Sequence, residues 1–185
     1  MGVFLTTHFY TQGWGEEAAA TTAGIVTAAV LFLGAFSSYY LSKWSDTVGR
    51  GNTILLCSVA SLAGELSLAL LFEASMWPLL IVACWTGFWI VADSAIYKTA
   101  LTEFVPNEIK TTALGIQSAI GFSLTVPSNY FFGYLLELVN PTSSPIEATI
   151  WFLPFFILFV GGLCAPLFSL ILRKYENVPR RSPNT

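Results

Sequence analysis

The chain alternates between long apolar runs and short polar stretches. A helix that crosses a bilayer needs about 20 mostly apolar residues. Five runs meet that length, at residues 18–41, 53–72, 77–97, 111–136 and 148–172. Strands of a membrane barrel would instead alternate apolar and polar positions over about ten residues. The pattern therefore predicts an all-α integral membrane protein, a helical bundle of five transmembrane helices.

The first 12 residues are apolar but too short to span a membrane. They read MGVFLTTHFYTQ, and a polar stretch separates them from the first full run. We expect a partial N-terminal helix here, so that the chain begins part-way through a sixth span. On this division the membrane domain covers residues 1–175, and residues 176–185 form a tail.

Composition supports a membrane protein and excludes several other classes. The chain is 55% hydrophobic and only 10% charged, whereas soluble domains carry about 25% charged residues. No basic tract suggests nucleic-acid binding. The three cysteines lie inside apolar runs without metal-site spacing, so we expect no metal and no cofactor. Because no hydrolase, metalloprotease or nucleotide-binding motif occurs, the chain is not expected to be an enzyme.

The placement of charge predicts the orientation. All Lys and Arg residues fall on one side of the predicted membrane: Lys43, Arg50, Lys98, Lys110, Arg173, Lys174, Arg180 and Arg181. The other side carries only acids: Glu16, Glu17, Glu73, Glu137 and Glu147. Cytoplasmic loops carry an excess of Lys and Arg. We therefore expect a multi-pass protein of the plasma membrane whose turn at residues 42–52 and C-terminus are cytoplasmic.

The turn at residues 42–52 reads SKWSDTVGRGN. A tight turn needs glycine where the backbone takes unusual angles, which suits Gly49. Asp46 can accept hydrogen bonds from a facing helix N-terminus and can pair with a cation such as Arg50. The turn is then either a contact that holds one conformation and releases in another, or a solvated turn whose charges only determine topology.

This turn resembles the cytoplasmic loop signature of the major facilitator superfamily, G-x-x-x-D-(R/K)-x-G-(R/K)-(R/K). Asp46, Gly49 and Arg50 match the signature. Ser42 replaces its first glycine, and Thr47 and Gly51 stand at positions where the family often has cations. These departures are typical of the weaker second copy, between spans eight and nine of twelve. In the family such a contact latches the cytoplasmic ends of the two halves, which is the role that the resemblance implies for Asp46, Gly49 and Arg50.

Two further stretches carry the same resemblance. EFVPNEIKTTALGIQSAIGF, residues 103–122, is similar to the link between spans ten and eleven, where Glu103, Pro106, Glu108 and residues 113–115 match and Thr111 replaces a usual glycine. QGWGEEAAATTAGIV is similar to the link between spans seven and eight. The resemblance implies the C-terminal half of the fold, from the end of span seven through spans eight to twelve.

A function follows from the resemblance as an expectation. The family moves small solutes by alternating access, in which two halves rock around a site near the bilayer midplane. The expected partners are a small solute, with or without protons, the lipid bilayer, and an N-terminal half in the same or a separate chain. The alternative is a membrane interaction or regulatory module that keeps the half-fold without transporting.

Acids inside the membrane are costly and are therefore functional candidates. Asp93 and Glu65 both lie within predicted spans. By resemblance the helix of Asp93 is span ten, which lines the cavity; the alternative is a local partner for Lys98 or Lys110. Glu65 is interpreted as a structural acid, with proton coupling as its other reading.

Uncharged polar residues within the spans are weaker candidates for transport. Gln117 and Asn129 lie on the fourth run, and Tyr97 lies on the third. Such side chains can equally join helices by hydrogen bonds. His8 has a side chain that can titrate near neutral pH, or it is a structural residue. No residue identifies the solute.

Overall fold

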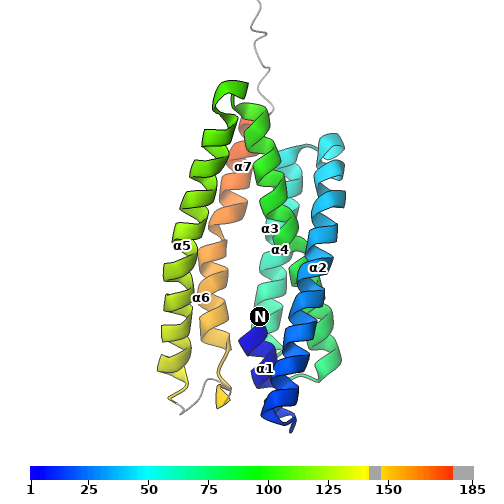
Figure 1. The fold of residues 1–185 in the computed structure, drawn as a ribbon, viewed down its shortest axis with the longest axis vertical. Helices are drawn as coiled ribbons and strands as arrows, with labels where there is room; N and C mark the ends of the chain where they lie inside the picture. Colours follow the sequence, from blue (N-terminus) through cyan, green and yellow to red (C-terminus); the bar gives the residue numbers. More distant parts are fainter. Residues whose placement is uncertain (142–146, 177–185) are drawn as a thin grey trace, which may run out of the picture.

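The computed structural model describes residues 1–141 and 147–176, and the described part contains helices and no strand (Figure 1). The predicted all-α fold is confirmed. The elements in chain order are α1 (Gly2–Thr11), α2 (Glu16–Val48), α3 (Arg50–Leu70), α4 (Met76–Phe104), the short 3-10 helix η1 (Asn107–Ile109), α5 (Lys110–Val139), α6 (Phe152–Gly162) and α7 (Cys164–Glu176). The predicted tail lies outside the described residues, apart from Glu176.

Four stretches of the described chain are helical, long and apolar enough to cross a membrane. They are Glu16–Val48, Arg50–Leu70, Met76–Phe104 and Phe152–Lys174, the last combining α6 and α7. The fourth predicted run is the 30-residue helix α5, which is long enough but not among them. Ser118, Ser123, Thr125 and Asn129 lower its apolarity. The division into five spans thus stays a prediction at α5.

Helix boundaries differ from the predicted ones mainly at the end of the bundle that carries the cations. α2 continues to Val48 rather than stopping at residue 41, and α4 continues to Phe104 rather than to residue 97. The apolar pattern marks only the stretch that suits lipid, whereas helical hydrogen bonding continues into the polar zone beyond it. The ends of these helices therefore bring polar side chains together outside the apolar layer.

The last predicted run, residues 148–172, is not one uninterrupted helix. Helix begins only at Phe152, and Leu163 separates α6 from α7. Pro166 lacks a backbone N–H, and its ring conflicts with the carbonyl of the residue four positions earlier, Gly162. This removes a helical hydrogen bond at the junction and explains the interruption.

Glycines allow α2, α3 and α4 to approach closely. A Cβ atom on Gly34 of α2 would lie 2.7 Å from the carbonyl oxygen of Gly87 on α4 and 2.7 Å from the Cβ atom of Val91. Ser37 Oγ donates a hydrogen bond across the same contact to the carbonyl of Phe88 at 2.5 Å. Small residues and interhelical hydrogen bonds of this kind hold membrane helices together.

The short helix α1 closes the opposite end of the bundle from the turn at residues 42–52 (Figure 1). Phe4 is fully buried, with its ring centroid 5.2 Å from that of Trp151 and 5.1 Å from that of Phe155. His8 is also fully buried, and its Nδ1 lies 2.9 Å from the carbonyl oxygen of Phe72. The geometry gives His8 a structural contact between α1 and the segment after α3.

Candidate functional site

The turn between α2 and α3 consists of one residue outside helical geometry, Gly49. Its φ is +98°, a conformation that side chains disfavour and that glycine adopts readily. The N–H of Gly49 donates to the carbonyl of Ser45, which ends α2, and the N–H of Thr53 donates to the carbonyl of Gly49, which begins α3. This tight turn places Asp46 and Arg50 on either side of Gly49.

Arg50 is the centre of a polar cluster that joins three helices. Its guanidinium forms an ion pair with Asp46 of α2. From α4, Glu103 receives two hydrogen bonds: Nη2 donates to Oε1 at 2.8 Å, and Nε donates to Oε2 at 3.4 Å. Nη1 donates to the carbonyl of Ser42 at 2.8 Å and to Ser45 Oγ. We call Asp46, Arg50 and Glu103 the Arg50 cluster.

Exposure within the Arg50 cluster is uneven. Arg50 is only 7% exposed, whereas the side chains of Glu103 and Asp46 are 40% and 56% exposed. Paired hydrogen bonds from one guanidinium edge to a carboxylate are geometrically specific, but solvent weakens an ion pair with such exposed acids. The arrangement can therefore hold the end of α4 against the α2–α3 turn and release it at modest cost.

The sequence did not predict that Glu103 is a partner of Arg50. Glu103 matches the family pattern at residues 103–122, but no partner was predicted for it. The available signal was an acid close to the end of the third predicted run, on the same side of the membrane as Arg50. The packing of α4 against α2 and α3 brings the two residues together.

Asp93 faces α3 from within α4. Ser58 Oγ donates to its Oδ2 at 3.4 Å, and its Oδ1 is buried without a hydrogen-bond partner in the described structure. In the described structure, neither Lys98 nor Lys110 forms an ion pair with Asp93. The geometry therefore does not support a local lysine partner, and any transport role of Asp93 stays a prediction.

Glu65 lies deeper on α3 and has a different neighbour. Its Oε2 would lie 3.8 Å from a Cβ atom placed on Gly162, so this carboxyl faces α6. Asp93 instead contacts Ser58. The two membrane acids therefore lie in separate surroundings, and the structure does not join them into one site.

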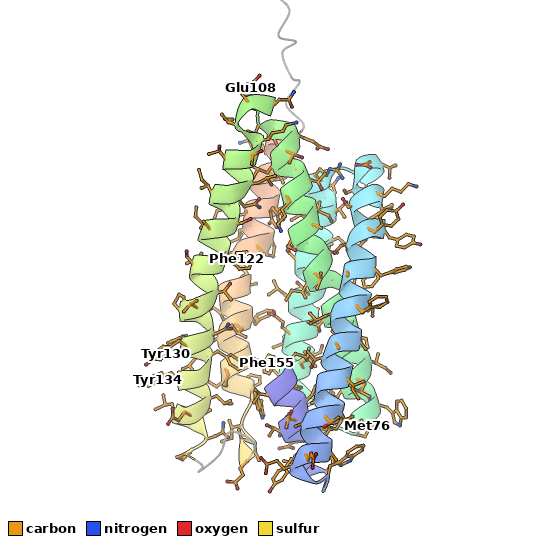
Figure 2. All side chains as sticks on the ribbon, viewed as in Figure 1. Met76, Glu108, Phe122, Tyr130, Tyr134 and Phe155 are labelled. Atoms are coloured by element: carbon orange, nitrogen blue, oxygen red, sulfur yellow. The ribbon has the colours of Figure 1, made fainter. Side chains whose placement is uncertain are left out.

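Gln117 and Asn129 lie in two different cavities along α5. Gln117 lines a cavity of about 620 Å³ between α4, α5 and α7. Asn129 lines a cavity of about 670 Å³ near the other end of α5, with Val3 of α1 and Ala148 among its walls. Figure 2 shows Tyr130 and Tyr134 directed away from the neighbouring helices. Gln117 and Asn129 therefore lie at two separate places along α5 rather than in one pocket.

Comparison with known proteins gives one match. The model of the Major Facilitator Superfamily matches residues 1–185, the whole chain. No curated protein matches the chain, and no solved structure does.

Proposed function

Because the chain belongs to the major facilitator superfamily, a family of membrane transporters, we propose that it moves a small solute by alternating access. In that mechanism two pseudo-symmetric halves rock around a midplane site. We further propose that the chain supplies the C-terminal half and works with an N-terminal half in the same or a separate polypeptide. The order of the three matching stretches supports this assignment.

The observation that carries the proposal is the Arg50 cluster. Arg50 is almost fully buried and binds acids from two other helices, Asp46 and Glu103. A buried guanidinium whose partners are half-exposed provides a contact that can form in one state of a transporter and weaken in another. We assign these residues to a latch between helix ends. The one-sided cations predict that this end of the bundle faces the cytoplasm.

The polar content of α5 supports the same function. α5 carries Ser, Thr and Asn side chains along its middle and is less apolar than the other long helices. Polar side chains within a membrane favour a protein interior or a water-filled path over lipid. We therefore propose that α5 borders the solute path, with Asn129 in its wall.

Asp93 is the proposed coupling acid if transport uses protons. An acid held inside the membrane is expensive unless it serves an ion or substrate pathway. The buried Oδ1 of Asp93 has no partner in the described structure, whereas Glu65 faces the backbone of α6. Neither acid forms an ion pair within the described residues, and Asp93 is preferred because its helix, by resemblance, is span ten, which lines the cavity.

Uptake into proteoliposomes tests the function. The chain would be reconstituted together with a candidate N-terminal half, joined to it in one polypeptide or added as a separate one. Uptake would be screened with radiolabelled sugars, amino acids, organic anions and organic cations. We expect saturable uptake of at least one solute class, and a changed rate with Asp46→Asn at unchanged expression. Absence of uptake above protein-free liposomes would favour a membrane interaction module that keeps the fold.

A further inference from the structure

The cavity that contains Gln117 lies at the end of the bundle that carries the Arg50 cluster. We call it the α4–α5–α7 cavity, after the helices that form its walls. Its volume is about 620 Å³, within the range of small-molecule sites, about 300–1,000 Å³. Its walls are mostly apolar and include Tyr97, Phe104, Ala113, Gln117, Phe168 and Leu172. The walls thus suit an apolar body.

One polar atom on this wall lacks a partner. Gln117 Oε1 is buried and accepts no hydrogen bond from the described residues. Leaving a buried acceptor without a donor is costly. Tyr97 also lines the cavity, but no hydrogen bond joins its hydroxyl group to Gln117 Oε1. An occupant with a single O–H or N–H group would satisfy Gln117 Oε1 while its body fills the apolar space. A lipid acyl chain would fill the space without supplying the donor.

We propose that the α4–α5–α7 cavity binds a small amphipathic molecule, with an apolar ring-sized body and one hydrogen-bond donor directed at Gln117 Oε1. All three walls come from this chain, so the site does not require a second half. It lies at the end of the bundle that carries the Arg50 cluster rather than at the midplane, where the solute site is proposed, so the inference goes beyond the transport function.

Equilibrium dialysis with the whole chain in lipid nanodiscs tests the site. The probe is 1-naphthol, which has a bicyclic apolar body and one hydroxyl donor. The matched probe is 1-methoxynaphthalene, which keeps the body and lacks the donor. The variants are Gln117→Leu, which removes the acceptor, and Ala113→Phe, which fills the cavity. Ala119→Phe, at an exposed position on α5, is the control for added bulk.

We expect one saturable site that binds 1-naphthol about tenfold more tightly than 1-methoxynaphthalene, the effect of one hydrogen bond. Gln117→Leu should remove this preference, Ala113→Phe should abolish the binding of both probes, and Ala119→Phe should change neither. Equal affinity for the two probes, as for a cavity that takes acyl chains, would overturn the proposal, as would the absence of saturable binding.

The binding test does not depend on the folding of every variant or on transport. If Ala113→Phe does not give a folded protein, the preference of the wild type and its loss in Gln117→Leu still decide the question. An unchanged preference in a folded Gln117→Leu protein overturns the proposal. Binding is measured without transport, so failure of the uptake experiment leaves this test intact.

Discussion

Arg50 combines a buried position with ion pairs to two neighbouring helices. It follows the positive-φ Gly49, it is nearly buried, and it binds a carboxylate from α2 and another from α4. Removing one partner of a buried charge costs more than removing an exposed ion pair, because the remaining charge loses its compensation. At the residue scale, the most informative substitutions are therefore those of its partners.

Glu103→Gln should loosen the end of α4. The substitution removes the charge while keeping the size, so Arg50 loses one of the two carboxylates, Asp46 and Glu103, that pair with it in the described part of the chain. Because Glu103 is partly exposed, we expect a loss of about 1 kcal/mol in the free energy of unfolding. Thermal unfolding in detergent measures this loss. Glu108→Gln is the control, because Glu108 lies at the exposed tip between α4 and α5 (Figure 2), and an equal effect of both variants would contradict a specific role for Glu103.

Asp93→Asn should reduce uptake driven by a pH gradient more than Glu65→Gln does. The reason is that the helix of Asp93 is, by resemblance, span ten, which lines the cavity, whereas the carboxyl of Glu65 faces α6 within this chain. Uptake into proteoliposomes with and without an imposed gradient measures the difference. If both variants keep the wild-type gradient dependence, proton coupling uses neither Asp93 nor Glu65.

At the scale of elements, backbone contact between α2 and α4 organises the bundle. Gly34 and Gly87 let the two helices approach until a side chain would meet backbone atoms. Trp85 Nε1 of α4 donates to the carbonyl of Ala60 at 2.9 Å and ties α3 to the same helix. α4 is thereby held on two sides, and Asp93 and Glu103 are both placed by it.

Gly34→Ala should separate α2 from α4. The added methyl group would lie 2.7 Å from the carbonyl oxygen of Gly87, and backbone cannot move aside as a flexible side chain can. We expect destabilisation of about 1–3 kcal/mol, as for other overpacked contacts. Thermal unfolding of the purified protein measures it. Gly24→Ala is the matched control on the same helix, because no atom lies within 4 Å of its added Cβ; a similar loss in both variants would argue against the contact.

α5 is the long helix that packs least against the rest of the described bundle. Only Leu135 and Leu136 of its 30 residues are buried. The side chains of Phe122, Tyr130 and Tyr134 extend from it in Figure 2, and all three are well exposed. This open surface and the two cavities along α5 explain why Gln117 and Asn129 have different neighbours although they lie on one helix.

At the scale of the whole molecule, the described Lys and Arg residues gather at one end of the bundle, whereas acids lie at both ends. Lys43, Arg50, Lys98 and Lys110 lie near the α2–α3 and α4–α5 connections. Glu16, Glu17 and Glu73 lie near the α1–α2 and α3–α4 connections. Figure 1 places these two sets of connections at opposite ends of the bundle. The one-sided placement of Lys and Arg supports the predicted orientation, in which the Arg50 end faces the cytoplasm.

Cysteine labelling tests that orientation. In a background without Cys57, Cys84 and Cys164, Thr47→Cys should react only with reagent on the cytoplasmic side. Ala74→Cys, in the connection between α3 and α4, should react only from the other side. A membrane-impermeant maleimide applied to sealed cells and to inverted vesicles provides the measurement. Labelling of both positions from one side would refute the topology.

The class of the protein follows from the amino-acid sequence alone, because the length of the apolar runs and the one-sided placement of the cations are properties of the chain. The sequence also located the α2–α3 turn and its three key residues, since a glycine-dependent turn is a local feature. The long helices were predicted near their observed positions, but their ends were not, because helices continue beyond the apolar layer.

The tertiary structure decided which residues meet. Glu103 lies 53 positions from Arg50, and only the packing of α4 beside α2 and α3 makes the pair. The same packing turns Asp93 toward Ser58, turns Glu65 toward α6, and places Gln117 in the wall of a cavity formed by α4, α5 and α7. Apolar periodicity could not make these assignments, because helices apolar on nearly all sides carry little signal of which face meets protein and which meets lipid.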